Sequence, residues 1–453
     1  MITTHPLNTD ESAAQRSDPA SIAPGLAGRH VLVDTYNIRL HQGSGIKTYG
    51  ITLLEALHAL DADISLLGDR QVARTRDRAL AEVLFYDHVR HRSRLARTLS
   101  SVHRGLATLF GAVAPVEIAE RHVLPDRALR PVPGPRRVFN ISRIYDSANV
   151  MYRRVGRFTR IKLTKTPDIW HATTLLPIEV RGARMVTTIH DLIPLRLPYT
   201  TLDDKKSFFN LAKDAIERSK MVLTVSECTK RDIVKFFNTD PQRIAVTYQS
   251  VAFKPYVADE GVERVVMKRY GLEPGRYLLF VGTIEPKKNV AAIIRAAAML
   301  DDDLTLVVAG RKGWLWEDEL EPAEHLFRKK QSKRFKLLDY VPEMDLPALY
   351  ANAFCLVFPS LYEGFGLPPL EAMAHGCPVI ASNTSSLPEV CGDAALLIDP
   401  HEPATIRTAI ERLRDEPRLR KTLIDRGYQR VEFFSPRNYA ERLRSAYQRV
   451  LTS

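Results

Sequence analysis

The sequence predicts an α/β protein built from two Rossmann-like domains. Its length of 453 residues exceeds what one ordinary core accommodates, and its 45% apolar and 26% charged residues are typical of globular proteins. Both halves show the order strand, glycine turn, helix. In the first half the apolar run 30–34 precedes a glycine turn and a helical pattern over 49–60. In the second, the run 353–358 precedes a glycine-rich turn and a helix that stops at Gly376.

Shifts in composition suggest where the domains begin and end. We expect a disordered tail over 1–28, because this segment is polar and contains Pro, Ser and Ala but no apolar signal-peptide core. The first domain is expected over 29–255, with an Arg-rich insert at about 70–165. A linker without a sustained apolar run is placed at 256–272. The remaining predicted units are a second domain over 273–432 and a final helix over 433–453 that returns to the first domain.

The Arg-rich insert contains a candidate amphipathic helix. Five apolar residues recur at helical spacing, with basic residues between them: Leu95, Leu99, Val102, Leu106, Leu109, and Arg92, Arg94, Arg97, His103, Arg104. A basic amphipathic helix is typical of a membrane-surface element, but the same pattern fits a helix that packs on its own domain. Both alternatives remain open at the level of the sequence.

Charge and cysteine usage narrow the class of protein. The 65 Lys and Arg residues exceed the 53 Asp and Glu residues, and the net charge of +12 favours anionic partners such as nucleotides, nucleic acid or acidic lipid headgroups. Four cysteines stand apart, without C-x-x-C spacing, and are expected to be reduced core thiols: Cys228, Cys355, Cys377 and Cys391. No run of about 18 apolar residues suggests a bilayer span. We therefore expect a cytoplasmic protein, with peripheral membrane contact left open.

The stretch 359–382 contains the strongest candidate for a binding site. Gly364 and Gly366 lie where a parallel strand gives way to a helix, and unpaired N–H groups at such a helix start can bind phosphate. Glu363 and Glu371 flank this position in the spacing E-x7-E. Because a carboxylate accepts hydroxyl hydrogens, two acids beside a phosphate site indicate a ligand that also carries hydroxyl groups.

Two strands of the first half also end in polar residues. The run 185–192 places His190 and Asp191 at its carboxyl end, and the run 168–172 does the same for His171. In parallel sheets these ends face the ligand, so each histidine is a candidate for contacting it. A buried structural histidine is the alternative for both.

The stretch around Gly364 resembles the E-x7-E signature of retaining GT-B glycosyltransferases of family 4. The match is continuous over about 275–400 and includes Val281-Gly282-Thr283-Ile284-Glu285-Pro286-Lys287-Lys288-Asn289, Ala309-Gly310-Arg311-Lys312-Gly313-Trp314 and Leu387-Pro388-Glu389-Val390-Cys391-Gly392-Asp393-Ala394-Ala395. The resemblance implies the GT-B fold, in which two Rossmann-like domains face each other across a cleft, with the donor held mainly by the second domain and the acceptor mainly by the first.

The same resemblance implies roles for individual residues. It places His190, Glu363 and Lys288 in the catalytic group, with Glu363 on a donor-sugar hydroxyl, Lys288 on the diphosphate and Glu371 on the ribose. The expected donor-binding residues are Gly43, Gly45, Thr283, Lys287, Lys288, Arg311, Lys312, Tyr340, Val341, Glu363, Gly364, Phe365, Gly366, Leu367 and Glu371, and the expected acceptor or sugar contacts are His171 and Asp191. Many relatives have Arg where this chain has Thr283, so the missing cation is expected from Arg311 or Lys312, unless these are simply solvated.

The resemblance is strongest to bacterial mannosyltransferases that assemble O-antigen or exopolysaccharide. It implies transfer of mannose from GDP-mannose to a lipid-linked saccharide acceptor, with a UDP-hexose as the alternative donor. It implies no cofactor and no metal, and the D-x-D spacings at 301–303 and 61–63 are expected to be turns. Two alternatives come from other functional classes: a basic nucleic-acid-binding protein and a nucleotide-dependent oxidoreductase. The first leaves Glu363 and Glu371 unexplained, and the second lacks the third glycine of G-x-G-x-x-G.

Overall fold

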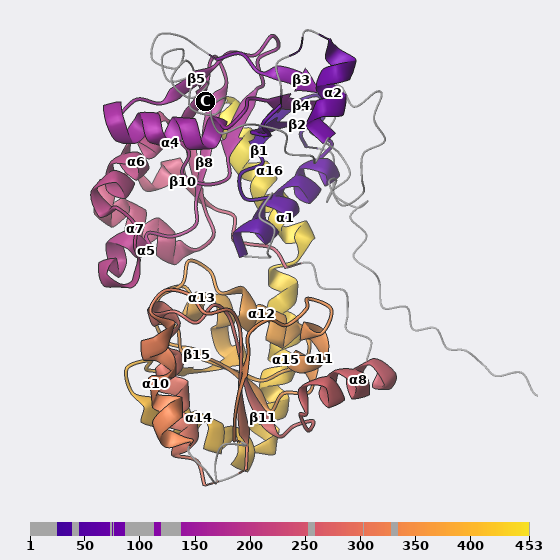
Figure 1. Cartoon of the computed structure of the whole chain (residues 1–453), viewed down its shortest axis with the longest axis vertical. Coiled ribbons are helices and arrows are strands. Elements are labelled where there is room, and N and C mark those ends of the chain that lie inside the picture. Colours follow the sequence, from indigo (N-terminus) through magenta and orange to yellow (C-terminus); the bar gives the residue numbers. More distant parts are fainter. Residues whose placement is uncertain are drawn as a thin grey trace, which may run out of the picture.

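The computed structural model contains two α/β domains, one above the other in Figure 1, joined at residues near 250 and again by the long C-terminal helices. The structure describes residues 25–38, 45–72, 75, 77–86, 113–118, 137–251, 259–301, 303–327 and 334–452. Three predictions concern residues outside these ranges: the role of Gly43, the helix at 92–109 and most of the N-terminal tail. The GT-B fold class predicted from the sequence is confirmed.

The first domain is organised around an eight-stranded sheet in the order β10-β9-β8-β6-β1-β2-β4-β3. All neighbouring strands are parallel except the edge pair of β3 and β4. The strands are β1 (His30–Asp34), β2 (Asp63–Gly68), β3 (Val116–Ile118), β4 (Arg137–Asn140), β6 (Ile169–Ala172), β8 (Arg184–Ile189), β9 (Met221–Thr224) and β10 (Ile244–Val246), and β5 (Thr159–Ile161) and β7 (Ile178–Val180) form a separate parallel pair. The described parts of the Arg-rich insert thus add strands to the sheet edge.

The second domain is built on a six-stranded, fully parallel sheet in the order β13-β12-β11-β14-β15-β16. Its strands are β11 (Tyr277–Val281), β12 (Thr305–Ala309), β13 (Phe335–Leu338), β14 (Cys355–Phe358), β15 (Val379–Ser382) and β16 (Ala395–Ile398). Helices cover both faces, which explains why these strands are almost continuously apolar. Chain order reverses between β11 and β14, so the loops after these two strands flank the switch point where ligands bind in such sheets.

Helices connect the strands and join the two domains. Their bounds are α1 (Gly45–Ala59), α2 (Arg78–Tyr86), α4 (Ile144–Val155), α5 (Ile193–Arg196), α6 (Lys205–Arg218), α7 (Glu227–Phe237), α8 (Glu260–Tyr270), α9 (Val290–Ala298), α10 (Trp316–Leu326), α11 (Leu346–Ala351), α12 (Leu367–Ala374), α13 (Leu387–Cys391), α14 (Pro403–Asp415), α15 (Pro417–Phe433) and α16 (Pro436–Thr452). α15 packs on α12 of the second domain, and α16 continues upward to pack on α1 of the first (Figure 1).

Two local expectations need correction. Most of the predicted linker is helix α8, which the low apolar content concealed because only Val266 and Met267 are buried. α8 belongs to the second domain, since Arg269 and Tyr270 both bond the Asp345 carboxylate just before α11. The segment 285–289 before α9 contains a single 3-10 turn over Pro286–Lys288, and α9 begins at Val290. The apolar pattern over 335–341 also predicts a strand, but that strand ends at Leu338.

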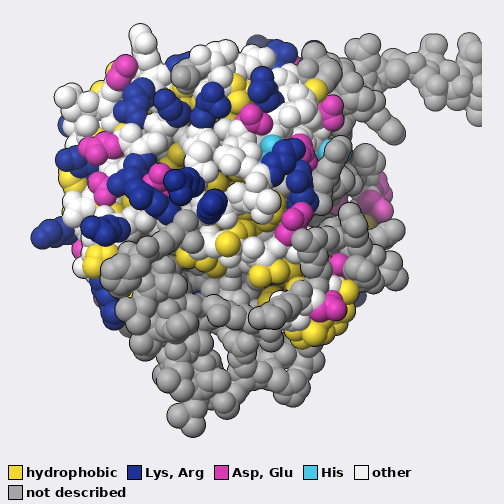
Figure 2. All heavy atoms as spheres, turned by 90° about the horizontal axis from the view of Figure 1, so that it is seen from above, with side chains coloured by type: hydrophobic (Ala, Val, Ile, Leu, Met, Phe, Trp, Pro, Cys, Tyr) yellow, Lys and Arg dark blue, Asp and Glu magenta, His cyan; other side chains and the backbone are white. Residues whose placement is uncertain are grey.

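The surface at the far end of the first domain is rich in positive charge. Figure 2 shows Lys and Arg side chains gathered on this face, which points away from the second domain. Exposed basic residues near the small β5–β7 sheet include Arg153, Arg154, Arg157, Arg160 and Lys162. No helix among the described residues combines the length and apolar character that a bilayer span requires.

Candidate active site

The turn between β14 and α12 places a helix start at the switch point of the second sheet. Gly366 precedes the first helical residue, Leu367, and has φ +102°, a backbone conformation that a side chain would strain. Pro368 and Pro369 in the first turn have no N–H group, which suits positions where no intrahelical partner exists. The helix therefore begins where the sequence predicted, at the carboxyl edge of the sheet, and among its first three residues only Leu367 has an N–H group.

Glu363 and Lys288 form a buried ion pair across the switch point. The Lys288 Nζ atom lies 2.5 Å from Glu363 Oε1, and their side chains are only 13% and 10% exposed. Burial by itself raises the pKa of Glu363, but the ammonium groups of Lys288 and Lys287 outweigh it, so the pKa lies below its ordinary value. Burial lowers the pKa of Lys287, and Glu363, Glu285 and Asp191 together reverse that effect. The site therefore holds charged carboxylate and ammonium groups together at neutral pH.

Glu371, eight residues further on, has a different environment. Its carboxylate accepts a hydrogen bond of 2.8 Å from the Tyr350 hydroxyl, and the side chain is partly exposed. Burial raises the pKa of Glu371 above its ordinary value. The two carboxylates of the E-x7-E spacing thus differ: Glu363 is neutralised by lysine, whereas Glu371 is held by a hydroxyl and keeps acceptor capacity for hydroxyl groups of a ligand.

His190 lies at the carboxyl end of β8 in the first domain. Its Nε2 atom is 2.9 Å from the Thr173 carbonyl oxygen. Because a carbonyl only accepts, Nε2 must be protonated, which leaves Nδ1 of the neutral ring as an acceptor. Burial lowers the pKa of His190, opposed by the Thr173 bond and by Asp191. The ring packs edge-on against Tyr49, with the centroids 4.8 Å apart, so the site receives a neutral, fixed imidazole.

A buried carboxylate supports this edge of the first sheet. Asp34, at the end of β1, accepts bonds from the Thr173 N–H, the Thr173 hydroxyl and the Tyr36 N–H. Burial raises the pKa of Asp34 to about 6. By holding Thr173, Asp34 also holds the carbonyl that orients His190.

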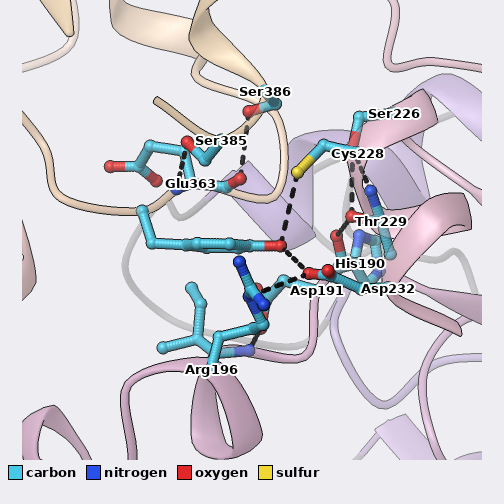
Figure 3. A network of polar contacts seen from close by, with 12 residues as sticks. His190, Asp191, Arg196, Ser226, Cys228, Thr229, Asp232, Glu363, Ser385 and Ser386 are labelled. Carbon is cyan, nitrogen blue, oxygen red and sulfur yellow. Dashed lines mark hydrogen bonds and ion pairs between the residues drawn. The ribbon is translucent and has the colours of Figure 1, made fainter. Parts of the chain in front are cut away.

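The carboxyl edges of the two sheets approach each other at Gly364. A Cβ atom at this position would lie 2.4 Å from the His190 carbonyl oxygen and 3.0 Å from the Asp191 Cβ, so only glycine permits this approach. A second link comes from Glu389 of α13, whose carboxylate accepts the N–H groups of Glu227 and Cys228 at the start of α7, at 2.9 and 2.7 Å. Figure 3 shows His190, Asp191 and α7 residues facing Glu363 and Ser385 across the domain boundary.

The expected sugar contact at His171 is corrected by the structure. The residue has no exposed surface, and its ring nitrogens bond the Tyr447 hydroxyl at 2.6 Å and the Thr188 hydroxyl at 2.7 Å. Burial lowers the pKa of His171 to about 3, so the ring is neutral. His171 joins α16 to the core of the first domain. Asp191, by contrast, lies at the boundary and accepts the N–H group of Ile193.

The remaining predicted donor residues are spread along the second sheet. The loop that contains Thr283 runs beside the loop of Arg311 and Lys312, since the Ile284 N–H donates to the Arg311 carbonyl. The Lys312 ammonium lies 3.9 Å from the centre of the Trp316 ring. Tyr340 is 68% exposed beyond β13, and Val341 beside it is half-buried. Their assigned roles stay predictions.

Two further residues predicted to bind the donor reach the same boundary from opposite sides. A Cβ atom on Gly45, at the start of α1, would lie 3.3 Å from the Leu367 side chain, and the Gly45 carbonyl accepts the amide of Gln249. Phe365 is buried beside Phe434, with ring centres 5.3 Å apart. Phe365 therefore belongs to the packing behind the turn, whereas Gly45 lies on the first-domain side of it.

Several residues that shape the site carried no signal in the sequence. Thr173 and Tyr49 fix His190, and Tyr350 holds Glu371, yet each is an ordinary residue of a strand end or helix. Tyr362 bonds Asp232 across the domain boundary, although its position beside Glu363 suggested only the motif. Such partners are contributed by distant segments, and only their convergence reveals them.

The described residues contain no group of three or more His, Cys, Asp or Glu side chains arranged to hold a metal ion. The D-x-D spacing at 61–63 lies at the turn before β2. There the Asp61 backbone has φ +59° and Asp63 pairs with Arg137. Metal independence of the reaction stays a prediction.

Comparisons with known proteins agree with this geometry. The family model for glycosyl transferases group 1 matches residues 265–430, and that for Glycosyltransferase Family 4 matches residues 43–252. The chain is 35% identical over 274 residues to an O-antigen chain mannosyltransferase B of Escherichia coli, a match that covers 59% of this chain and 71% of that one. The fold and site thus define a glycosyltransferase.

More particularly, the chain belongs to the family 4 glycosyltransferases with a group 1 C-terminal domain. It is also 29% identical over 294 residues to a serotype-specific mannosyltransferase WbdA of Escherichia coli, covering 62% of this chain but only 35% of that longer protein. Among solved structures, Anabaena Alr3699/HepE in complex with UDP-glucose matches with a TM-score of 0.62 at 13% identity, over 92% of this chain and 99% of that one. This last likeness concerns the fold.

Proposed function

We propose that this glycosyltransferase transfers a hexose, mannose from GDP-mannose, to a lipid-linked saccharide acceptor with retention of anomeric configuration. The relative named O-antigen chain mannosyltransferase B supports the sugar and the pathway, and the serotype-specific mannosyltransferase supports the sugar. A retaining enzyme of this class reacts on one face of the sugar, where the leaving phosphate oxygen takes the acceptor's proton. The pair of Glu363 and Lys288 at the switch point is the observation that carries the proposal.

The arrangement of charges suits a sugar diphosphate. Lys288 and Lys287, together with the N–H end of α12, offer positive charge to the departing diphosphate. In the free protein the Lys288 ammonium donates to the Glu363 carboxylate. When the donor binds, this ammonium can turn to the phosphate while Glu363 accepts a sugar hydroxyl. Glu371 takes the ribose hydroxyls, and His190 faces the sugar from the other domain through Nδ1.

A panel of nucleotide sugars tests the donor and metal assignments together. Thermal unfolding is followed with GDP-mannose, GDP, UDP-glucose, UDP and ADP-glucose, each with and without EDTA. We expect stabilisation by GDP-mannose that EDTA leaves unchanged, and loss of that stabilisation in Glu371→Ala. A larger shift with UDP-glucose would instead favour the UDP-hexose alternative, and a shift abolished by EDTA would contradict a metal-independent site.

We further propose that the enzyme works at an anionic membrane surface, where a lipid-linked acceptor would be found. The exposed basic residues at the far end of the first domain support this, since each cation near an anionic surface contributes roughly 1 kcal/mol of attraction. Co-sedimentation with vesicles containing phosphatidylglycerol should therefore exceed that with neutral vesicles and weaken with salt. Deleting residues 90–104 asks whether the predicted helix, which lies outside the described residues, also contributes.

The nucleic-acid alternative receives no support from the site. Glu363 and Asp191 lie together at the domain boundary beside Lys287, and acids repel a phosphodiester backbone.

A further inference from the structure

A cavity separate from the residues assigned to the donor opens between the two domains. Its volume is about 390 Å³, within the range of small-molecule sites. The first domain lines it with residues of α5 and one face of α7, and the second with the ends of the loops after β14 and β15. The lining residues are Arg196, Leu197, Cys228, Arg231, Asp232, Leu361, Tyr362, Thr384 and Ser385.

The polar groups of this cavity leave donors in excess. Asp232 is neutralised within the wall, since it accepts the Tyr362 hydroxyl and lies 3.5 Å from the Arg196 guanidinium. Arg231 donates no hydrogen bond and forms no ion pair to any residue that the structure describes. Glu389, the acid whose charge it feels, already uses both carboxylate oxygens on N–H groups at the start of α7. Arg231 is exposed and lines the cavity without a direct hydrogen-bond or ion-pair partner among the described residues, so its guanidinium is available to a ligand.

Hydroxyl donors complete the arrangement on the opposite wall. The Ser385 oxygen accepts the N–H group of Glu363 at 3.0 Å, and its own hydrogen reaches no acceptor in the described part of the chain. Ser385 also has φ +56°, in the left-handed region that costs free energy for a residue other than glycine. A guanidinium and a hydroxyl converging from two domains match the acceptor oxygens of a phosphate group.

We infer that this interdomain cavity is a second ligand site, which binds a phosphate group through Arg231, Arg196 and Ser385. A ligand here would touch both domains and would also adjoin the backbone of Glu363, so its binding should strengthen donor binding and be strengthened by it. The phosphate can belong to a lipid-linked acceptor or to a free phosphorylated metabolite. The first source rests on the proposed function, and the second does not.

Titration calorimetry with inorganic pyrophosphate tests the site on the full chain. The chain is first saturated with the nucleotide that stabilises it in the thermal-unfolding panel. If no nucleotide stabilises it, the chain is titrated alone. We expect Arg231→Gln to weaken pyrophosphate binding about tenfold or more, because a hydrogen bond to a charged group is lost. Lys235→Gln removes the same charge from the same helix outside the cavity and should leave binding unchanged. Ser385→Ala should weaken binding less.

The outcomes separate the possible sources and failures. Tighter binding of farnesyl diphosphate than of pyrophosphate would assign the site to a lipid-linked acceptor, and equal binding would assign it to a free phosphorylated molecule. Pyrophosphate that binds equally well to Arg231→Gln, or that is displaced by the nucleotide, would overturn the inference. Because donor binding is measured separately in the nucleotide panel, failure of this site leaves the proposed function standing.

Discussion

The two domains bring opposite kinds of chemistry to their shared boundary. The second presents charges: Lys288, Lys287 and Glu363 lie together beside a helix start. The first presents a neutral ring, His190, whose proton is fixed by a backbone carbonyl and whose position depends on the buried Asp34 and Thr173. A diphosphate needs charge neutralisation, whereas a sugar hydroxyl needs an oriented acceptor. The difference supports the proposal that the second domain holds the anion and the first places the sugar.

Among the charged residues of the second domain, removal of Lys288 should have the largest effect on stability and turnover. In Lys288→Met the buried Glu363 carboxylate loses its partner, and we expect the free energy of unfolding to fall by about 3 kcal/mol. Turnover should fall about a thousandfold, since the cation beside the leaving phosphate is lost. Urea denaturation and steady-state kinetics measure both effects.

The double variant Lys288→Met/Glu363→Gln serves as the control for that experiment. It removes the uncompensated charge, so stability should recover while turnover does not. Equal stability of the single variant and the wild type would show that the ion pair is not needed for folding.

The contact between the two edges is tested at Gly364. In Gly364→Ala the new methyl group would meet the His190 carbonyl, which must move apart by about 1 Å. A displacement of that size between reacting groups costs about a hundredfold in kcat. Gly261→Ala, at the start of helix α8, meets only the Asp259 side chain that caps this helix, at 3.1 Å, and is the matched control. Wild-type kinetics in Gly364→Ala would mean that the domains react in a more open arrangement.

The neutral side of the comparison predicts a particular pH dependence. Burial lowers the pKa of His190 from its ordinary value, so titration of this ring should reduce kcat only at a lower pH than an exposed histidine would. Asp191 raises the pKa of His190, so Asp191→Asn should move any acid limb that His190 causes to lower pH. A limb that moves to higher pH would contradict the assignment.

The smallest effect concerns the hydroxyl that holds Glu371. Tyr350→Phe removes one hydrogen bond to this carboxylate, and we expect the nucleotide Kd to rise about fivefold, equivalent to about 1 kcal/mol, with kcat little changed. Tyr199→Phe, at a tyrosine that is 70% exposed, is the matched control. A fall in kcat with unchanged Kd would place Glu371 at the reacting centre instead of the ribose.

Local patterns predicted much of the fold because its strands are buried on both faces. Continuous apolar runs located β11, β12, β14 and β15, and the glycines and prolines around Gly366 located the start of α12. α8 escaped detection because so few of its side chains are buried, and the early end of β13 could not be read from a pattern that continues through Val341. Element boundaries depend on packing partners that a local pattern does not contain.

The sequence by itself determined the class of the protein, the E-x7-E carboxylates and the lysines of the second domain, because these lie within one βαβ unit and its neighbouring loop. Tertiary structure alone decided that His190 is oriented by Thr173 while His171 serves the core, and that Gly364 touches the opposite domain. Both histidines end buried strands and look alike in the chain. Their difference arises from residues as distant as Tyr447, which only folding brings within 2.6 Å of one of them.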